Sequence, residues 1–97
     1  MDAAAIKAKA DELQKTNKWR EAYEYLEPYA DEATDPEVLW RVIRSFYRMG
    51  KFLARNNEER DQIARKAQLI SERALQLDEK NYNVQKVSRV LGLSIIE

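Results

Sequence analysis

Three arginines recur along one short stretch of the chain at spacings of three and four residues. They are Arg41, Arg44 and Arg48, and Lys51 nearly extends the row. Positions three and four apart lie on one face of a helix, so this spacing predicts a cationic stripe. The planar guanidinium group matches carboxylates and phosphates with paired N–H donors. The chemistry that these residues could perform is therefore the binding of an acidic ligand.

The residue types that usually perform catalysis are missing or lie in the wrong setting. The sequence contains no histidine and no cysteine, which removes the usual general base and the thiol nucleophile. None of its serines lies in a Gly-x-Ser-x-Gly segment. It also has no His/Cys metal set and no glycine-rich phosphate loop. The sequence therefore predicts a protein that is not an enzyme and that uses no metal or cofactor.

The composition favours one small helical domain. Of the 97 residues, 35% are charged and 44% are hydrophobic, and only two glycines and two prolines are present. This balance is typical of surface-charged helices rather than of a sheet. The formal net charge is zero, so no overall field attracts nucleic acid or a membrane surface. Without cysteine, apolar membrane span or secretory pattern, a single domain over residues 1–97 in the cytoplasm is expected.

Residues 35–50 predict the helix that carries the arginines. Asp35 can cap its start, and Pro36 suits the first turn because its missing N–H costs nothing there. Gly50 can adopt the left-handed conformation that closes a helix. Large apolar side chains share another face at spacings of three and four: Trp40, Ile43, Phe46 and Tyr47. We therefore expect this helix in the middle of a helical stack, with its cationic face accessible.

Four further helices are expected, over residues 3–16, 19–33, 57–77 and 82–96. Asn17 can cap the second of them. Pro28 lies inside that helix and is expected to kink it, because proline cannot donate a backbone hydrogen bond. Residues 51–56 predict a loop in which Phe52 and Leu53 tuck against the stack.

Large residues recur at the period of the tetratricopeptide repeat, about 34 residues. Trp40 follows Ile6 by 34 residues, and Tyr47 follows Leu13 by the same interval. This pattern predicts antiparallel helix pairs stacked as a tetratricopeptide-like superhelix of about five helices. Trp19 and Trp40 are accordingly expected to be anchors of its core.

Three segments resemble the regulator of microtubule dynamics family. They are Glu-Ala-Tyr-Glu-Tyr-Leu-Glu-Pro-Tyr, Asp-Pro-Glu-Val-Leu-Trp-Arg-Val-Ile-Arg and Arg-Ala-Leu-Gln-Leu-Asp-Glu-Lys-Asn-Tyr. The resemblance covers roughly residues 10–86, and its most specific part lies at Trp40, Arg41 and Arg44. Family members are longer, so this chain is expected to be an N-terminal fragment of a longer repeat domain or a short divergent member. The resemblance implies a protein-interaction module at microtubules or the spindle that binds the acidic tails of tubulin.

In the superhelix register, six side chains are expected to bind the partner at the concave face, with Arg44 at its edge. They are Lys7, Arg41, Arg44, Ser45, Arg48 and Arg89. Asp11 and Gln85 are expected to point the same way. Residues 34–51 hold four cations and two anions, whereas residues 17–33 hold two cations and five anions. The alternative is structural, since Arg41 and Arg44 could instead pair with the carboxylates of the second helix.

Two other functions stay open at this stage. An apolar tunnel between the third and fifth helices with a cationic mouth would hold an anionic lipid, whereas an open polar groove would favour a peptide. The fifth helix also carries apolar residues that could make the chain a self-associating scaffold, namely Val87, Leu91 and Ile95.

Overall fold

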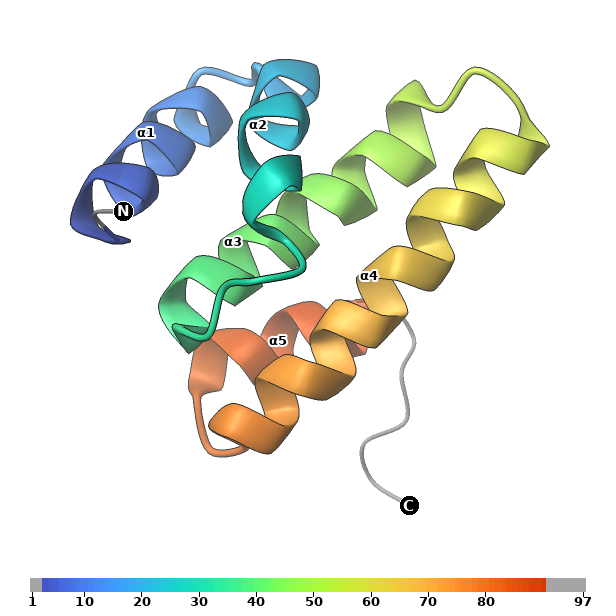
Figure 1. The fold of residues 1–97 in the computed structure, drawn as a ribbon. Helices are drawn as coiled ribbons and strands as arrows, with labels where there is room; N and C mark the ends of the chain where they lie inside the picture. The colour runs from blue at the N-terminus through green and yellow to red at the C-terminus, as the bar shows by residue number, and fades with distance from the viewer. Residues whose placement is uncertain (1–2, 91–97) are drawn as a thin grey trace.

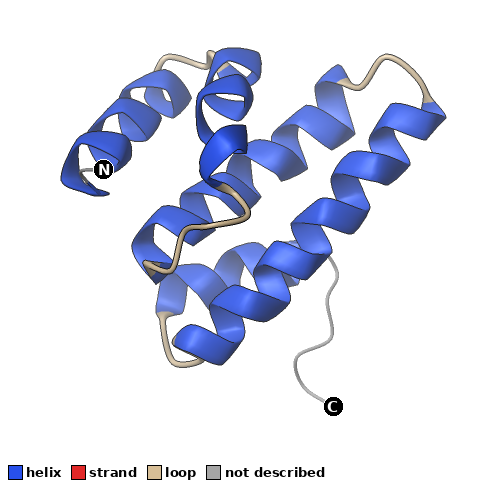
Figure 2. Ribbon diagram, viewed as in Figure 1, coloured by secondary structure: helices blue, strands red, loops and turns tan. Residues whose placement is uncertain are grey.

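Helices dominate the computed structural model of the chain, which describes residues 3–90 (Figures 1 and 2). In order they are α1 Ala3–Lys15, α2 Trp19–Leu26, α3 Pro36–Arg48, α4 Asn57–Leu77 and α5 Tyr82–Val90. A 3₁₀ turn, Glu27–Tyr29, follows α2, and a π-helix, Met49–Leu53, follows α3. The prediction of an all-α fold with five helices is confirmed. The end predicted for the fifth helix, at residue 96, lies outside the described residues.

The central element is α3, as predicted. It lies alongside α4, which runs in the opposite direction, and it also contacts α1, α2 and α5 (Figure 1). Apolar residues cover several sides of α3, so it can bury surface against all four neighbours. Those that are buried are Val38, Leu39, Val42, Ile43 and Phe46.

The link between α1 and α2 ends the first helix instead of capping the second. Asn17 has a φ of 61°, in the left-handed region. Its N–H donates to the carbonyl of Gln14 at 3.1 Å, and the N–H of Lys18 donates to the carbonyl of Leu13 at 2.8 Å. These two bonds form a Schellman motif. The predicted N-cap at Asn17 is wrong, because Lys18 occupies that position and makes no side-chain cap bond.

We expect Asn17→Ala to lower the free energy of unfolding by about 1 kcal/mol, because alanine lacks the short polar side chain that lets asparagine adopt the left-handed conformation at low cost. Asn17→Gly should cause no such loss, since glycine adopts this conformation freely. Urea denaturation of the two variants and the parent chain measures the difference. Equal losses in both variants would contradict the assignment of this turn.

Pro28 ends α2 rather than kinking it. The α-helix stops at Leu26, and the 3₁₀ turn that contains Pro28 follows at once. Proline has no N–H for the carbonyl of Glu24, and its ring crowds that carbonyl, so the α-helical bond pattern cannot continue. The predicted helix to residue 33 is therefore too long.

Gly50 does not adopt the predicted left-handed conformation. It lies within the π-helix Met49–Leu53, where an added Cβ would meet Cγ2 of Ile63 at 3.3 Å. Glycine at this position therefore lets α4 approach closely. The prediction that Phe52 and Leu53 tuck against the stack is also wrong, since they are 60% and 38% exposed.

The helix α4 spans the residues that were predicted for it, 57–77. Asn56 caps α4, its Oδ1 accepting the N–H of Glu59 at 2.8 Å. The apolar stripe of α4 is buried at Ile63, Ala67, Ile70 and Ala74. The hydroxyls of Ser71 on α4 and Ser88 on α5 lie 3.4 Å apart in the buried interface. No helix within residues 3–90 has the length and apolar content to cross a bilayer.

Candidate functional site

Arg41 joins α3 to α1. Its Nε and Nη2 donate to the carboxylate of Asp11 at 2.7 and 3.2 Å, and its Nη1 donates to the carbonyl of Glu37 at 2.6 Å. Only 13% of its side chain is exposed. The predicted role of Arg41 on an accessible binding face is therefore not supported by its position. The alternative partners on α2 are wrong too, because α1 and α3 supply the carboxylates.

Ser45 also lies away from the surface. It is fully buried, and its hydroxyl accepts a hydrogen bond from Nε2 of Gln14 at 2.8 Å. The same Gln14 amide donates to the carbonyl of Arg41 at 3.0 Å. The prediction that Ser45 faces a partner is corrected by this burial, since the residue helps to hold α1 on α3.

Lys7 and Asp35 meet at the start of α3. Nζ of Lys7 lies 3.7 Å from the carboxylate of Asp35, which also accepts the N–H of Glu37 at 2.9 Å. The capping role predicted for Asp35 is confirmed. Lys7 therefore has an ion-pair partner at the helix start and does not line the cavity described next.

Arg44 and Arg48 remain the accessible part of the arginine row. Their guanidinium carbons lie 5.5 and 4.8 Å from the ring centroid of Trp19, and that of Arg48 is 5.6 Å from the ring of Phe52. Within the described range, no carboxylate comes within 4.0 Å of either guanidinium. Cation–π contact holds a guanidinium in place without neutralising it. Trp19 is half-buried and does not belong to the hydrophobic core, so the anchor role predicted for it is wrong. Its ring is instead a platform for the two guanidinium groups.

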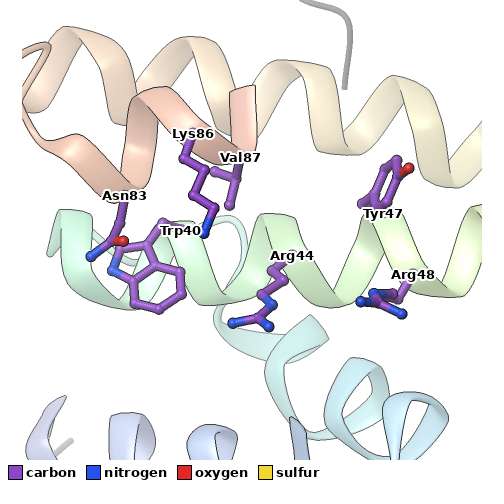
Figure 3. Close-up of a pocket in the computed structure, with 7 residues that line it drawn as sticks. All are labelled: Trp40, Arg44, Tyr47, Arg48, Asn83, Lys86 and Val87. Carbon is purple, nitrogen blue, oxygen red and sulfur yellow. The ribbon is translucent and has the colours of Figure 1, made fainter. Parts of the chain in front are cut away.

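A cavity of about 280 Å³, the α3–α5 cavity, opens beside these arginines (Figure 3). Its lining residues are Trp40, Arg44, Tyr47, Arg48, Asn83, Lys86 and Val87. This lining contains three cations and no acidic residue. Figure 3 shows the side chain of Lys86 reaching from α5 toward α3, with its amine near Trp40. Positive charge thus reaches the cavity from two helices, which favours an anionic ligand.

Glu37 fixes the indole of Trp40 at the edge of this cavity. Its carboxylate accepts hydrogen bonds from Nε1 of Trp40 at 3.0 Å and from Nδ2 of Asn81 at 2.7 Å. These bonds lower the pKa of the Glu37 carboxyl, the one from Trp40 most strongly. Trp40 also packs against the hydrophobic core, so the anchor role predicted for it is confirmed, although its ring is not fully buried.

The residues that α5 contributes to the α3–α5 cavity differ from those that the sequence predicted. Asn83, Lys86 and Val87 line the cavity, whereas the sequence register pointed to Gln85 and Arg89. Arg89 is exposed and does not belong to the lining. The helical period of the sequence could have indicated these two polar lining residues. Asn83 comes directly before the buried Val84, and Lys86 comes directly before the buried Val87.

The apolar face predicted for self-association is partly used inside the molecule. Val87 belongs to the hydrophobic core and is 9% exposed. Leu91 and Ile95 lie outside the described residues. Within residues 3–90, no three histidine, cysteine or carboxylate side chains gather in a way that could hold a metal ion.

Comparison with known proteins places the chain. Residues 6–95 match a family model described as regulator of microtubule dynamics protein 1-3. No curated protein and no solved structure matches the chain. The family match extends over the helices that build the α3–α5 cavity and agrees with the resemblance of the three sequence segments. The chain therefore belongs to the family of regulator of microtubule dynamics proteins 1-3.

Proposed function

We propose that this chain is a non-catalytic interaction module of the cytoplasm that binds an acidic peptide in the α3–α5 cavity. The observation that supports this proposal is the lining of the cavity, which contains Arg44, Arg48 and Lys86 and no acidic residue. The family to which the chain belongs is one of regulators of microtubule dynamics. The acidic tails of tubulin have the matching chemistry, so we propose them as the ligand.

The ion-pair pattern supports a binding role for these three cations. Arg41 and Lys7 already have carboxylate partners within 4.0 Å, and they lie outside the lining. The two arginines of the cavity contact the Trp19 ring instead, which restricts their motion and leaves their N–H donors for a ligand. A carboxylate that binds there gains charge-assisted hydrogen bonds at a reduced entropic cost.

The shape of the cavity favours a peptide over a lipid. Its volume is about 280 Å³, and its walls carry cationic, amide and aromatic groups. Small-ligand pockets usually measure ~300–1,000 Å³, so this space falls below the range that a lipid with acyl chains would need. A few peptide side chains fit a cationic site of this size better.

Co-sedimentation with microtubules tests the proposal. The variant Arg44→Glu/Arg48→Glu/Lys86→Glu should bind at least about tenfold more weakly, because each lost ion pair and each new repulsion contributes up to ~1 kcal/mol. Binding of the parent chain should also weaken as salt is raised from 0.05 to about 0.3 M, since salt screens exposed charges. Microtubules whose acidic tails have been removed should bind the parent chain as weakly as intact microtubules bind the variant.

A matched control reverses three exposed cations elsewhere. Lys9, Arg65 and Lys80 are exposed and make no ion pair within 4.0 Å in the part of the chain that the structure describes. The variant Lys9→Glu/Arg65→Glu/Lys80→Glu has the same net charge as the cavity variant and should retain binding. Equal losses in both variants, or salt-insensitive binding that neither affects, would rule the proposal out.

A further inference from the structure

We infer that the acidic peptide also carries a bulky apolar side chain, which enters a second cavity between α3, the π-helix and α4. This inference rests on the function proposed for the α3–α5 cavity and adds a specificity to it. The second cavity, here the α3–α4 cavity, has a volume of about 440 Å³. It is lined by Phe46, Tyr47, Gly50, Lys51, Arg60, Ile63, Ala64 and Ala67.

The two cavities share one wall. Tyr47 lines both of them, and Figure 3 shows its side chain rising from α3 on the side of α4. A ligand that occupies the α3–α5 cavity therefore reaches the α3–α4 cavity by passing a single side chain. The two cavities therefore adjoin at Tyr47 along α3.

The second cavity has an apolar floor and a cationic rim. Phe46, Ile63 and Ala67 on its floor are at most 5% exposed. On the rim, Nζ of Lys51 donates to the Tyr47 hydroxyl at 2.9 Å, and Nε of Arg60 donates to the Gly50 carbonyl at 3.3 Å. Neither rim cation has a carboxylate within 4.0 Å among residues 3–90. Such a site fits an apolar side chain that is flanked by acidic residues.

The spacing of the cations sets the spacing of the peptide. Arg44 and Lys51 are seven residues apart along α3 and the π-helix, which corresponds to roughly 10 Å along the helix axis. An extended peptide advances about 3.3 Å per residue. An apolar side chain that enters beside Lys51 should therefore lie about three residues from the carboxylate that contacts Arg44.

The test uses short labelled peptides and the full chain. Each peptide has two adjacent glutamates and a phenylalanine three residues away, in either order, and its control replaces the phenylalanine with alanine. Fluorescence anisotropy should show about tenfold tighter binding for one phenylalanine peptide than for its alanine control, because burial of the ring removes apolar surface from water. Ala64→Trp fills the cavity and should abolish that preference while weak binding of the alanine peptide persists. Ala64→Ser, a small change at the same exposed position, should keep the preference.

The outcomes separate this inference from the proposed function. Equal binding of both peptides by the parent chain overturns the inference, whereas loss of binding in the triple cavity variant still supports the α3–α5 site. The parent chain could also show no preference for the phenylalanine peptide while the variant Leu91→Ser/Ile95→Ser shows one. That result would assign the cavity to the chain's own last residues and overturn the inference. Concentration-dependent mass that Ala64→Trp abolishes would assign it to a second copy, with the same consequence.

Discussion

Phe46→Ala is expected to lower the free energy of unfolding by about 3–5 kcal/mol, the usual cost of removing a buried aromatic side chain. Phe46 is fully buried on α3, and its ring lies 4.8 Å from that of Tyr23 on α2. It also lines the α3–α4 cavity, so truncation enlarges a space that already exists. For a domain of this size each kcal/mol corresponds to ~4–8 °C in Tm. Thermal unfolding followed by circular dichroism should therefore show a shift of at least about 12 °C.

Tyr82→Ala provides the control for this change. Tyr82 is also aromatic, but it is 70% exposed at the start of α5. Its truncation should change the free energy of unfolding by less than about 0.5 kcal/mol. If the two variants unfolded at similar temperatures, α3 would not be the centre of the core.

Arg41→Glu is expected to lower the free energy of unfolding by about 2–3 kcal/mol. The guanidinium joins Asp11 on α1 to Glu37 on α3, and a carboxylate in its place would face two other carboxylates. The estimate lies below the 3–5 kcal/mol typical of broken buried pairs, because Asp11 and Glu37 are 53% and 40% exposed. Urea denaturation measures it, and Arg41→Met should lose less because it adds no repulsion.

Arg44→Glu is the matched comparison, one turn further along the same helix. Arg44 is exposed and has no carboxylate partner within 4.0 Å in the described region, so its reversal should leave stability within about 0.5 kcal/mol. We therefore expect Arg41 to contribute mainly to the stability of the fold and Arg44 mainly to ligand binding. A large stability loss in Arg44→Glu, with none in Arg41→Glu, would reverse the assignment of their roles.

Local sequence rules predicted most of the helices because their signals are local. The Asp35 cap, the Pro36 start and the four-three spacing of the apolar residues on α4 each act within a few residues. Gly50 illustrates the limit of such rules. A glycine after a helix usually permits a left-handed turn, but here its missing side chain serves an approach to Ile63, thirteen residues away.

The candidate site was predictable only in part for the same reason. The spacing of Arg41, Arg44 and Arg48 placed them near one face, but it could not show that Asp11 would reach Arg41 from α1. Ser45 lies next to the exposed Arg44 in sequence, yet it is turned into the α1 interface. The α5 residues depend on how that helix rotates against α3 and α4, which the packing of Val84 and Val87 decides.

Both tryptophans of the chain lie at the proposed binding surface. The guanidinium groups of Arg44 and Arg48 lie over the ring of Trp19, and Trp40 lines the α3–α5 cavity. Indole emission depends on nearby charge and on contact with water, so an occupant of this surface should alter the intrinsic fluorescence of the protein. The molecule therefore contains its own optical probe, and titrations can be followed without attaching a dye to it.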